Sequence, residues 1–159
     1  MTVALVTGGG RGIGRAVAAR LAADGMRVAI GDIDHEAARS AANTIPGAVG
    51  SALDVTDPDS FTEFVRATES QLGPVDVLVN NAGVMPIGPY LEQSESLRRS
   101  TVDINVHGPL NGMNAVLPGM RTRRRGHIVN IASTAAMIAV PGAVVYSATK
   151  HAVLGMSEA

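Results

Sequence analysis

The segment Thr7-Gly8-Gly9-Gly10-Arg11-Gly12-Ile13-Gly14 decides the fold, because it joins a short apolar run to a helical pattern. The run at residues 2–6 predicts a buried strand, and Ile13, Val17 and Leu21 recur at a spacing of four, as on one face of a helix. Glycines let the backbone approach a ligand closely, and the N-terminus of a helix attracts anions. The segment therefore favours a phosphate-binding turn over a purely structural turn.

The glycine spacing matches neither of two standard phosphate-binding motifs. The dinucleotide-binding pattern G-x-G-x-x-G is absent, and the spacing observed instead is that of Gly8, Gly12 and Gly14. A P-loop is also absent, because Gly9 and Gly14 have its glycine spacing but Arg15-Ala16 replaces the required Lys-Ser/Thr pair. The case for a nucleotide rests on the position of the turn directly after a first strand.

Strand and helix patterns alternate along the rest of the chain. Apolar runs predict further strands at residues 27–30, 48–53, 75–79 and 127–132. Helical patterns lie between these strands, at residues 36–42, 57–72 and 94–117, and a last helix follows Pro141-Gly142. Such alternation predicts an α/β fold with a parallel sheet and helices on both faces, formed by residues 1–159 as a single domain.

Local signals mark where the helices begin, where they bend and which faces they bury. Asp34 and Asp57 are expected N-caps, the second with a proline directly after it. Gly108, Pro109 and Gly112 predict a kink or break in the long helix. One face of the helix at residues 57–72 carries Phe61, Phe64, Val65, Thr68 and Leu72.

Composition excludes several classes of protein. Hydrophobic residues make up 46% of the 159 residues and the net charge is -1, so the chain is not intrinsically disordered. The absence of a basic excess argues against nucleic-acid binding. The chain has no cysteine, which excludes a disulfide scaffold and is compatible with the reducing cytoplasm, where we expect the protein. The four histidines are scattered without metal-ligand spacing, so no metal site is expected.

Neither a signal peptide nor a membrane span is expected. The N-terminus has no basic segment before its apolar run. Residues 128–149 carry no charge and follow the arginines at 121–125, but Pro141-Gly142 would break a spanning helix. The arginine cluster is best interpreted as a solvated helix terminus.

Asp32 follows the second predicted strand, eighteen residues after Gly14. An acidic residue at about this distance accepts hydrogen bonds from the adenosine ribose of a bound dinucleotide; the alternative is a surface turn aspartate. A carboxylate there repels a 2′-phosphate, at a cost of roughly 4 kcal/mol for charges about 4 Å apart at an effective dielectric constant near 20. The sequence thus favours NAD over NADP, although Arg11 would partly offset that preference.

Together these residues resemble the short-chain dehydrogenase/reductase family. The resemblance rests on an ordered set of motifs that spans nearly the whole chain, namely Thr7-Gly8-x-x-x-Gly12-x-Gly14, Asn80-Asn81-Ala82-Gly83, Asn105, Ser133 and Tyr146-x-x-x-Lys150. It implies a Rossmann-type doubly wound sheet, a nicotinamide cofactor and hydride transfer to or from a secondary alcohol or ketone.

The resemblance also implies roles for single residues. Asp54 and Val55 would contact the adenine, and residues 81–83 would line the adenosine ribose. Tyr146 would be the general acid/base, Lys150 its activator and a ribose ligand, Ser133 a donor to the substrate oxygen and Asn105 part of a proton relay. The expected cofactor-binding residues are Thr7, Gly8, Arg11, Gly12, Ile13, Gly14, Asp32, Asp54, Val55, Asn81, Ala82, Gly83, Tyr146 and Lys150. Asn80 is expected to stabilise the sheet rather than bind a ligand.

The chemistry of the Tyr146–Lys150 pair agrees with this assignment. Residues four apart on a helix share one face. A free tyrosine has a pKa of about 10 and is a poor base near neutral pH, and a neighbouring ammonium favours the phenolate form. In isolation, a packed aromatic and a solvated lysine would be the simpler interpretations.

The chain differs from the family pattern in length. Family members continue into two further strands, a mobile substrate loop and a Pro-Gly segment near the nicotinamide, which residues 1–159 do not contain. We therefore expect a sheet that is incomplete at its C-terminal edge, with residues 127–132 as an exposed edge strand. We also expect NAD binding with weak or absent turnover. The alternative function is a non-catalytic nucleotide-binding or interaction fragment. A homo-oligomer is expected for the full-length protein, and the identity of the small-molecule substrate stays open.

Overall fold

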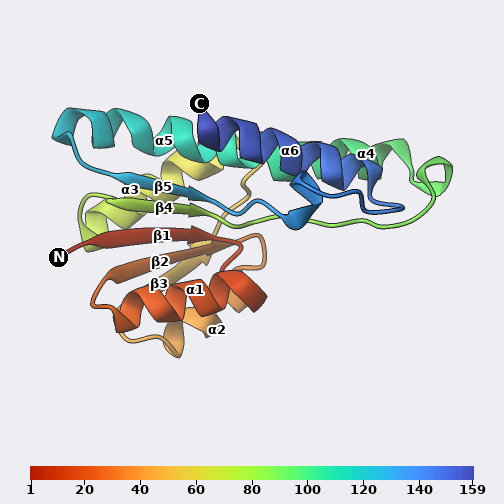
Figure 1. Ribbon diagram of the computed structural model, residues 1–159. Coiled ribbons are helices and arrows are strands. Elements are labelled where there is room, and N and C mark those ends of the chain that lie inside the picture. Colours follow the sequence, from red (N-terminus) through yellow and green to blue (C-terminus); the bar gives the residue numbers. More distant parts are fainter.

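Five parallel strands form a single sheet, in the spatial order β3-β2-β1-β4-β5, in the computed structural model, which describes residues 1–159 (Figure 1). The strands are β1 (Val3–Thr7), β2 (Arg27–Asp32), β3 (Ala48–Ala52), β4 (Val77–Asn80) and β5 (His127–Asn130). Val6 of the central strand pairs with Ile30 on one side and with Val79 on the other. The chain therefore winds outward from β1 in both directions, which confirms the predicted α/β doubly wound sheet.

Helices cover both faces of the sheet. The helices α1 (Gly12–Ala23) and α2 (His35–Asn43) lie on one face, and α3 (Pro58–Leu72) and α5 (Gly108–Arg123) lie on the other (Figure 1). The helix α6 (Val144–Glu158) packs beside α4 (Glu95–Val102). No helix is both long enough and apolar enough to cross a membrane.

The two predicted N-caps are confirmed. The Asp34 carboxylate accepts a hydrogen bond from the Ala37 backbone N–H at 3.0 Å, and Asp57 accepts one from the Asp59 N–H at 2.9 Å. Pro58 follows Asp57 in the first turn of α3, where no intrahelical N–H donor is needed. These short contacts depend only on neighbouring residues, which is why the sequence pattern could predict them.

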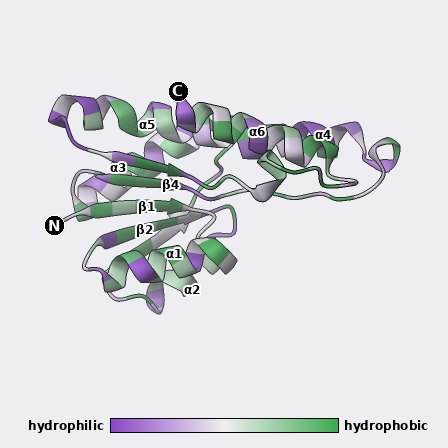
Figure 2. Cartoon of the chain, viewed as in Figure 1, coloured by the Kyte–Doolittle hydropathy of each residue, from purple (hydrophilic) through white to green (hydrophobic).

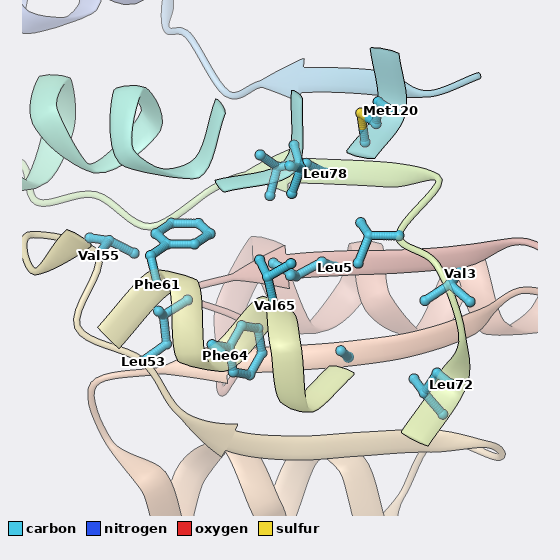
Figure 3. Close-up of a cluster of buried hydrophobic side chains, with 13 residues drawn as sticks. Val3, Leu5, Leu53, Val55, Phe61, Phe64, Val65, Leu72, Leu78 and Met120 are labelled. Atoms are coloured by element: carbon cyan, nitrogen blue, oxygen red, sulfur yellow. The ribbon is translucent and has the colours of Figure 1, made fainter. Parts of the chain in front are cut away.

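The alternation of β1 divides the core between the two faces. Val3 and Leu5 pack against α3 and α5, whereas Ala4 and Val6 pack against α1 and α2. The predicted apolar face of α3 is buried, and Figure 3 shows Val65 of this face beside Leu5 of β1. Figure 2 shows the same organisation as hydrophobic central strands beneath helices of mixed polarity.

The sequence predicts that Ile13 shares the apolar face of α1 with Val17 and Leu21, and for Ile13 this prediction is wrong. Ile13 is 67% exposed, and only Val17 and Leu21 of that face pack on the core. The first turn of α1 stands at the rim of a crevice, so the side chain of Ile13 faces that opening instead of the sheet.

The break in the long helical region lies just before the position predicted from glycine and proline. A π-helical turn at Asp103–His107 separates α4 from α5, and Pro109 then lies in the first turn of α5, which tolerates proline. Gly112 does not break α5, and the position needs a glycine because a Cβ there would meet the Phe61 ring at 2.8 Å. A π turn is wider than an α turn, and it carries Asn105 into the interior.

The strand β5 lies at the edge of the sheet, as expected, but ends two residues earlier than predicted, at Asn130. Val129 is 44% exposed. Asn80 of β4 donates a hydrogen bond from Nδ2 to Asn130 Oδ1 at 2.9 Å and a longer one to the Pro109 carbonyl at 3.4 Å. Asn80 therefore joins β4 to β5 and α5, which confirms its predicted role in the sheet.

Candidate cofactor crevice and active site

A crevice of about 710 Å³ opens at the carboxyl ends of the central strands. This is where open parallel sheets bind ligands, because the strand order reverses there. Most of the sequence-predicted cofactor residues line it, namely Gly8, Arg11, Ile13, Gly14, Asp32, Asp54, Val55, Asn81, Ala82 and Gly83. The fold thus brings together residues that are separated by more than seventy positions in the chain.

The glycines of the turn serve two different purposes. Gly8 and Gly12 have φ angles of 62° and 56°, in the left-handed region that favours glycine. A Cβ at Gly14 would collide with the Gly8 carbonyl oxygen, so this glycine lets the turn pack on the helix. Gly12 does not line the crevice itself, but nothing lies within 4 Å of the position of a Cβ there, so the space beside this residue is open.

Asp32 is held rigidly at the side of the crevice. It is 7% exposed; its Oδ2 accepts a hydrogen bond from the Gly10 N–H at 2.9 Å, and its Oδ1 accepts one from the Asp34 N–H at 3.1 Å. A carboxylate has about four acceptor positions, so each oxygen keeps a lone pair for a further donor. The Arg11 guanidinium pairs with Asp34 at 3.5 Å rather than with Asp32.

Thr7 lies behind the wall of the crevice instead of lining it. Its side chain is buried, and its Oγ1 accepts hydrogen bonds from the backbone N–H groups of Asn81 and Ala82, both at 3.0 Å. Asn81 in turn donates from Nδ2 to the carbonyl oxygens of Thr7 and Gly8, at 2.9 and 3.0 Å. These contacts fasten the segment after β4 to the glycine turn.

Asn105 connects that segment to α6. The side chain is 1% exposed, its Nδ2 donates to the Val84 carbonyl at 2.9 Å and to Thr149 Oγ1 at 3.0 Å, and its Oδ1 accepts from the Val84 N–H at 2.9 Å. Thr149 then donates to the Tyr146 carbonyl at 2.7 Å. Sequence reasoning missed Val84 and Thr149, because neither carries a motif of its own.

Lys150 and Tyr146 lie on the same side of α6. The Lys150 Nζ is 5.9 Å from the centroid of the Tyr146 ring and donates a hydrogen bond to the Ile131 carbonyl at 2.6 Å. A Cβ at Gly83, in the crevice wall, would lie 3.8 Å from the Lys150 Nζ and 3.2 Å from Asn105 Oδ1. Lys150 and Asn105 therefore lie beside the crevice wall at Gly83, although Tyr146 and Lys150, both expected among the cofactor residues, do not line the crevice itself.

Ser133 stands at the exit of β5, half-buried, at the start of a short 3-10 turn (η3, Thr134–Ala136). Its Oγ accepts a hydrogen bond from the Ala135 N–H at 3.1 Å, and the Oγ–H donates to no group of the chain. Ser133 thus keeps a free donor close to the carboxyl edge of the sheet, where its predicted role requires one.

Several residues of the crevice carried no sequence signal. Asp103 and Ile104 reach it only because of the π turn, and Ile33 and Thr56 directly follow predicted site residues. Adjacency to Asp32 and Val55 was the one signal that could have found the latter two. The additional lining residues are Ile33, Leu53, Thr56, Val84, Ser100, Asp103 and Ile104. No group of three or more metal-ligating side chains is present.

Burial lowers the pKa of Lys150 below its ordinary value of 10.5, because an ammonium loses hydration in the interior. Lys150 is the only lysine in the chain, so a sample with isotope-labelled lysine gives a single side-chain NMR signal. We expect this signal to titrate below pH 10.5 in the folded protein and near 10.5 after unfolding in urea. A folded-state midpoint at or above 10.5 would contradict the burial of the amine.

The lowered pKa of Lys150 makes the free energy of unfolding depend on pH. Between the lowered pKa of Lys150 and 10.5, the unfolded chain binds more protons than the folded chain. The contribution of this residue to the free energy of unfolding therefore rises with pH across that window. A Lys150→Met variant, measured in parallel, should lack this contribution.

Comparison with known proteins identifies the family. The family model described as short chain dehydrogenase matches residues 2–159. The chain is 41% identical to a putative ketoacyl reductase of the monensin polyketide synthase from Streptomyces virginiae, over 99% of this chain and 62% of that protein. It is 39% identical to an L-2,3-butanediol dehydrogenase from Corynebacterium glutamicum, over 99% of this chain and 64% of that protein.

Solved structures agree with this result. A short-chain dehydrogenase/reductase from Burkholderia phymatum in complex with NAD superposes with a TM-score of 0.95 at 33% identity, over 99% of this chain and 58% of that one. An actinorhodin polyketide ketoreductase with NADPH gives a TM-score of 0.95 at 38% identity, over 99% of this chain and 62% of that one. The chain thus spans about 60% of the length of these relatives. With the fold, the crevice and the ordered motifs in place, the chain belongs to the short-chain dehydrogenase/reductase family.

Proposed function

We propose that this chain carries the cofactor-binding and proton-transfer residues of an NAD-dependent oxidoreductase that acts on a secondary alcohol or ketone. The observation that carries the proposal is the position of Gly83. This residue lines the crevice and also lies beside Lys150 Nζ and Asn105 Oδ1. A dinucleotide in the crevice would therefore lie beside Lys150, whose amine is 5.9 Å from the ring centroid of Tyr146, the residue proposed to exchange the proton.

The residues of the crevice fit a dinucleotide. The open backbone at Gly12 and the N-terminus of α1 suit a pyrophosphate, and the free lone pairs of Asp32 suit the hydroxyls of a ribose. Asp54 and Val55 would contact the adenine, and residues 81–83 would line the adenosine ribose. When bound, the nicotinamide supplies or accepts the hydride.

The proposed proton transfer uses the Tyr146 hydroxyl. In the direction of reduction, the substrate carbonyl carbon gains a hydride and the carbonyl oxygen gains the Tyr146 proton. The tyrosine is left as a phenolate, which the protonated Lys150 amine stabilises and which solvent then reprotonates. The free Oγ–H of Ser133 donates a hydrogen bond to the same substrate oxygen and orients it.

Asn105 is proposed to take part in the proton relay and also to hold the site together. The hydrogen bonds of its amide to Val84 and Thr149 connect the crevice wall to the helix that carries Tyr146. Loss of these hydrogen bonds would therefore let α6, and Tyr146 with it, shift relative to the crevice wall.

The first test is cofactor binding by residues 1–159. We expect the purified chain to raise the fluorescence of NADH and to bind NADPH more weakly, because Asp32 faces the ribose position. A Gly12→Val variant has a side chain in the open part of the turn at a φ of 56°, and it should bind neither nucleotide. The conservative variant Gly155→Ala, far along α6, serves as the control. Equal NADH signals from wild type and Gly12→Val would contradict the proposal.

A further inference from the structure

Two loops leave the carboxyl edge of the sheet and run side by side. One follows β4 and ends at α4, and the other follows β5 and ends at α6, as Figure 1 shows in green and blue. They meet at two glycines, where the Gly88 N–H donates a hydrogen bond to the Gly142 carbonyl at 3.0 Å. The candidate catalytic residues Ser133 and Tyr146 lie at the start of the second loop and just beyond its end.

The contact between the loops is close enough to require glycine. Gly142 has a φ of 76°, in the left-handed region. A Cβ at Gly142 would lie 3.3 Å from the Gly88 nitrogen and 3.5 Å from its oxygen. A larger residue at this position would push the loops apart.

Gln93 joins the two loops from the side. It is 8% exposed, and its Nε2 donates to the Gly88 carbonyl at 3.2 Å and, at the longer distance of 3.5 Å, to the Gly142 carbonyl. The backbone of Gln93 is itself held, because Arg98 of α4 donates to its carbonyl at 2.6 Å. The Gln93 side-chain amide therefore contacts both loops, while the Gln93 backbone is itself held by Arg98.

The helix α6 begins directly after Gly142, with Ala143 as its N-cap. The N-terminus of α6 has no side-chain cap, and its first turn starts at Ala143, which is fully buried. The Ser147 N–H donates to the Ala143 carbonyl at 2.7 Å, so Tyr146 lies within this first turn. Without a cap, the start of the turn is held by the contacts of Gly142 with Gly88 and Gln93, in addition to the bonds that Thr149 and Lys150 make further along the helix.

We propose that Gln93 is a positioning residue, which holds the two loops together and thereby sets the first turn of α6 and the Tyr146 hydroxyl relative to the crevice. The effect on turnover rests on the proposed function, whereas the effect on the loops does not. Gln93 contacts neither the crevice nor Tyr146 itself.

The test compares Gln93→Met, which keeps the size of the side chain and removes its donors, with Gln71→Met at an exposed site on α3. Amide hydrogen exchange at Gly88 and Ser147 should become about tenfold faster in Gln93→Met, the loss expected for one or two hydrogen bonds. The Gly10 amide, bonded to Asp32, should keep its rate. With a ketone substrate, kcat should fall about fivefold or more, because a displaced Tyr146 donates its proton less well in the transition state, while NADH binding stays within about twofold, since the crevice is untouched.

The exchange rates of these amides decide whether Gln93 holds the two loops together. Unchanged exchange at Gly88 and Ser147 overturns the inference, and so does faster exchange at Gly10 as well, which would show a general loss of stability. If Gln93→Met does not fold, Gly142→Ala disturbs the same contact and should give the same local pattern. A wild-type chain that binds no NADH contradicts the proposed function, yet the exchange rates still decide whether Gln93 positions α6.

Discussion

Replacement of Tyr146 by phenylalanine is expected to lower kcat by about 10²- to 10⁴-fold, the usual contribution of a general acid/base. The ring stays to pack at its half-buried position on α6, and only the exchangeable proton is removed. The measurement is NADH oxidation with a ketone, in the polypeptide that contains these residues. NADH binding should change by no more than about twofold, because the side chain supplies no wall of the crevice.

The matched control for this variant is Tyr90→Phe, since Tyr90 is the only other tyrosine of the chain. Tyr90 is 47% exposed and its ring lies under the Arg98 guanidinium, so loss of its hydroxyl should leave kcat unchanged. An unchanged kcat in Tyr146→Phe would overturn the proposed chemistry. A biological effect that survives the substitution would favour the alternative function, a nucleotide-binding module without catalysis.

Replacement of Asp32 by asparagine is expected to reverse or abolish the preference for NADH over NADPH. The change removes the charge but keeps an oxygen that can accept the Gly10 N–H. Repulsion between like charges about 4 Å apart is worth roughly 4 kcal/mol at an effective dielectric constant near 20, or about 10³-fold before salt screening. The ratio of the two dissociation constants, measured at low salt, should therefore shift by about 10- to 10³-fold toward NADPH.

The ratio of the two dissociation constants distinguishes a loss of charge repulsion from structural damage to the glycine turn. Loss of the Asp34 or Gly10 hydrogen bonds would weaken both nucleotides alike and leave the ratio unchanged. Asp59→Asn, at an exposed carboxylate in the first turn of α3, controls for the change in net charge. If Asp32→Asn keeps the ratio of the wild type, the carboxylate does not discriminate between the two cofactors.

Much of the fold could be predicted because its signals are local. The caps Asp34 and Asp57 act within three residues, and the buried face of α3 follows from helical periodicity alone. The order of strands and helices followed from alternating patterns, because right-handed crossovers leave few ways to arrange a parallel sheet. The family motifs then carried the roles of Tyr146 and Lys150, which stay predictions until they are tested.

The structure departs from the sequence-based predictions where segments that are far apart in the chain contact one another. Ile13 fits a helical face, but its turn stands at the mouth of the crevice and leaves the side chain exposed. Thr7 has the family position of a cofactor residue, yet its hydroxyl is used by backbone groups 74 and 75 residues away. Asp103 and Ile104 reach the crevice through a π turn, which no spacing of glycine and proline indicated.

By itself, then, the amino-acid sequence determined the elements, their order and the kinds of side chain available for chemistry, since these depend on neighbours along the chain. Only the tertiary structure decided which side chains face the crevice, that Gly83 adjoins Lys150, and that Gln93 reaches two loops at once. Such contacts depend on how segments far apart in the sequence pack against one another, and local sequence patterns do not predict that packing.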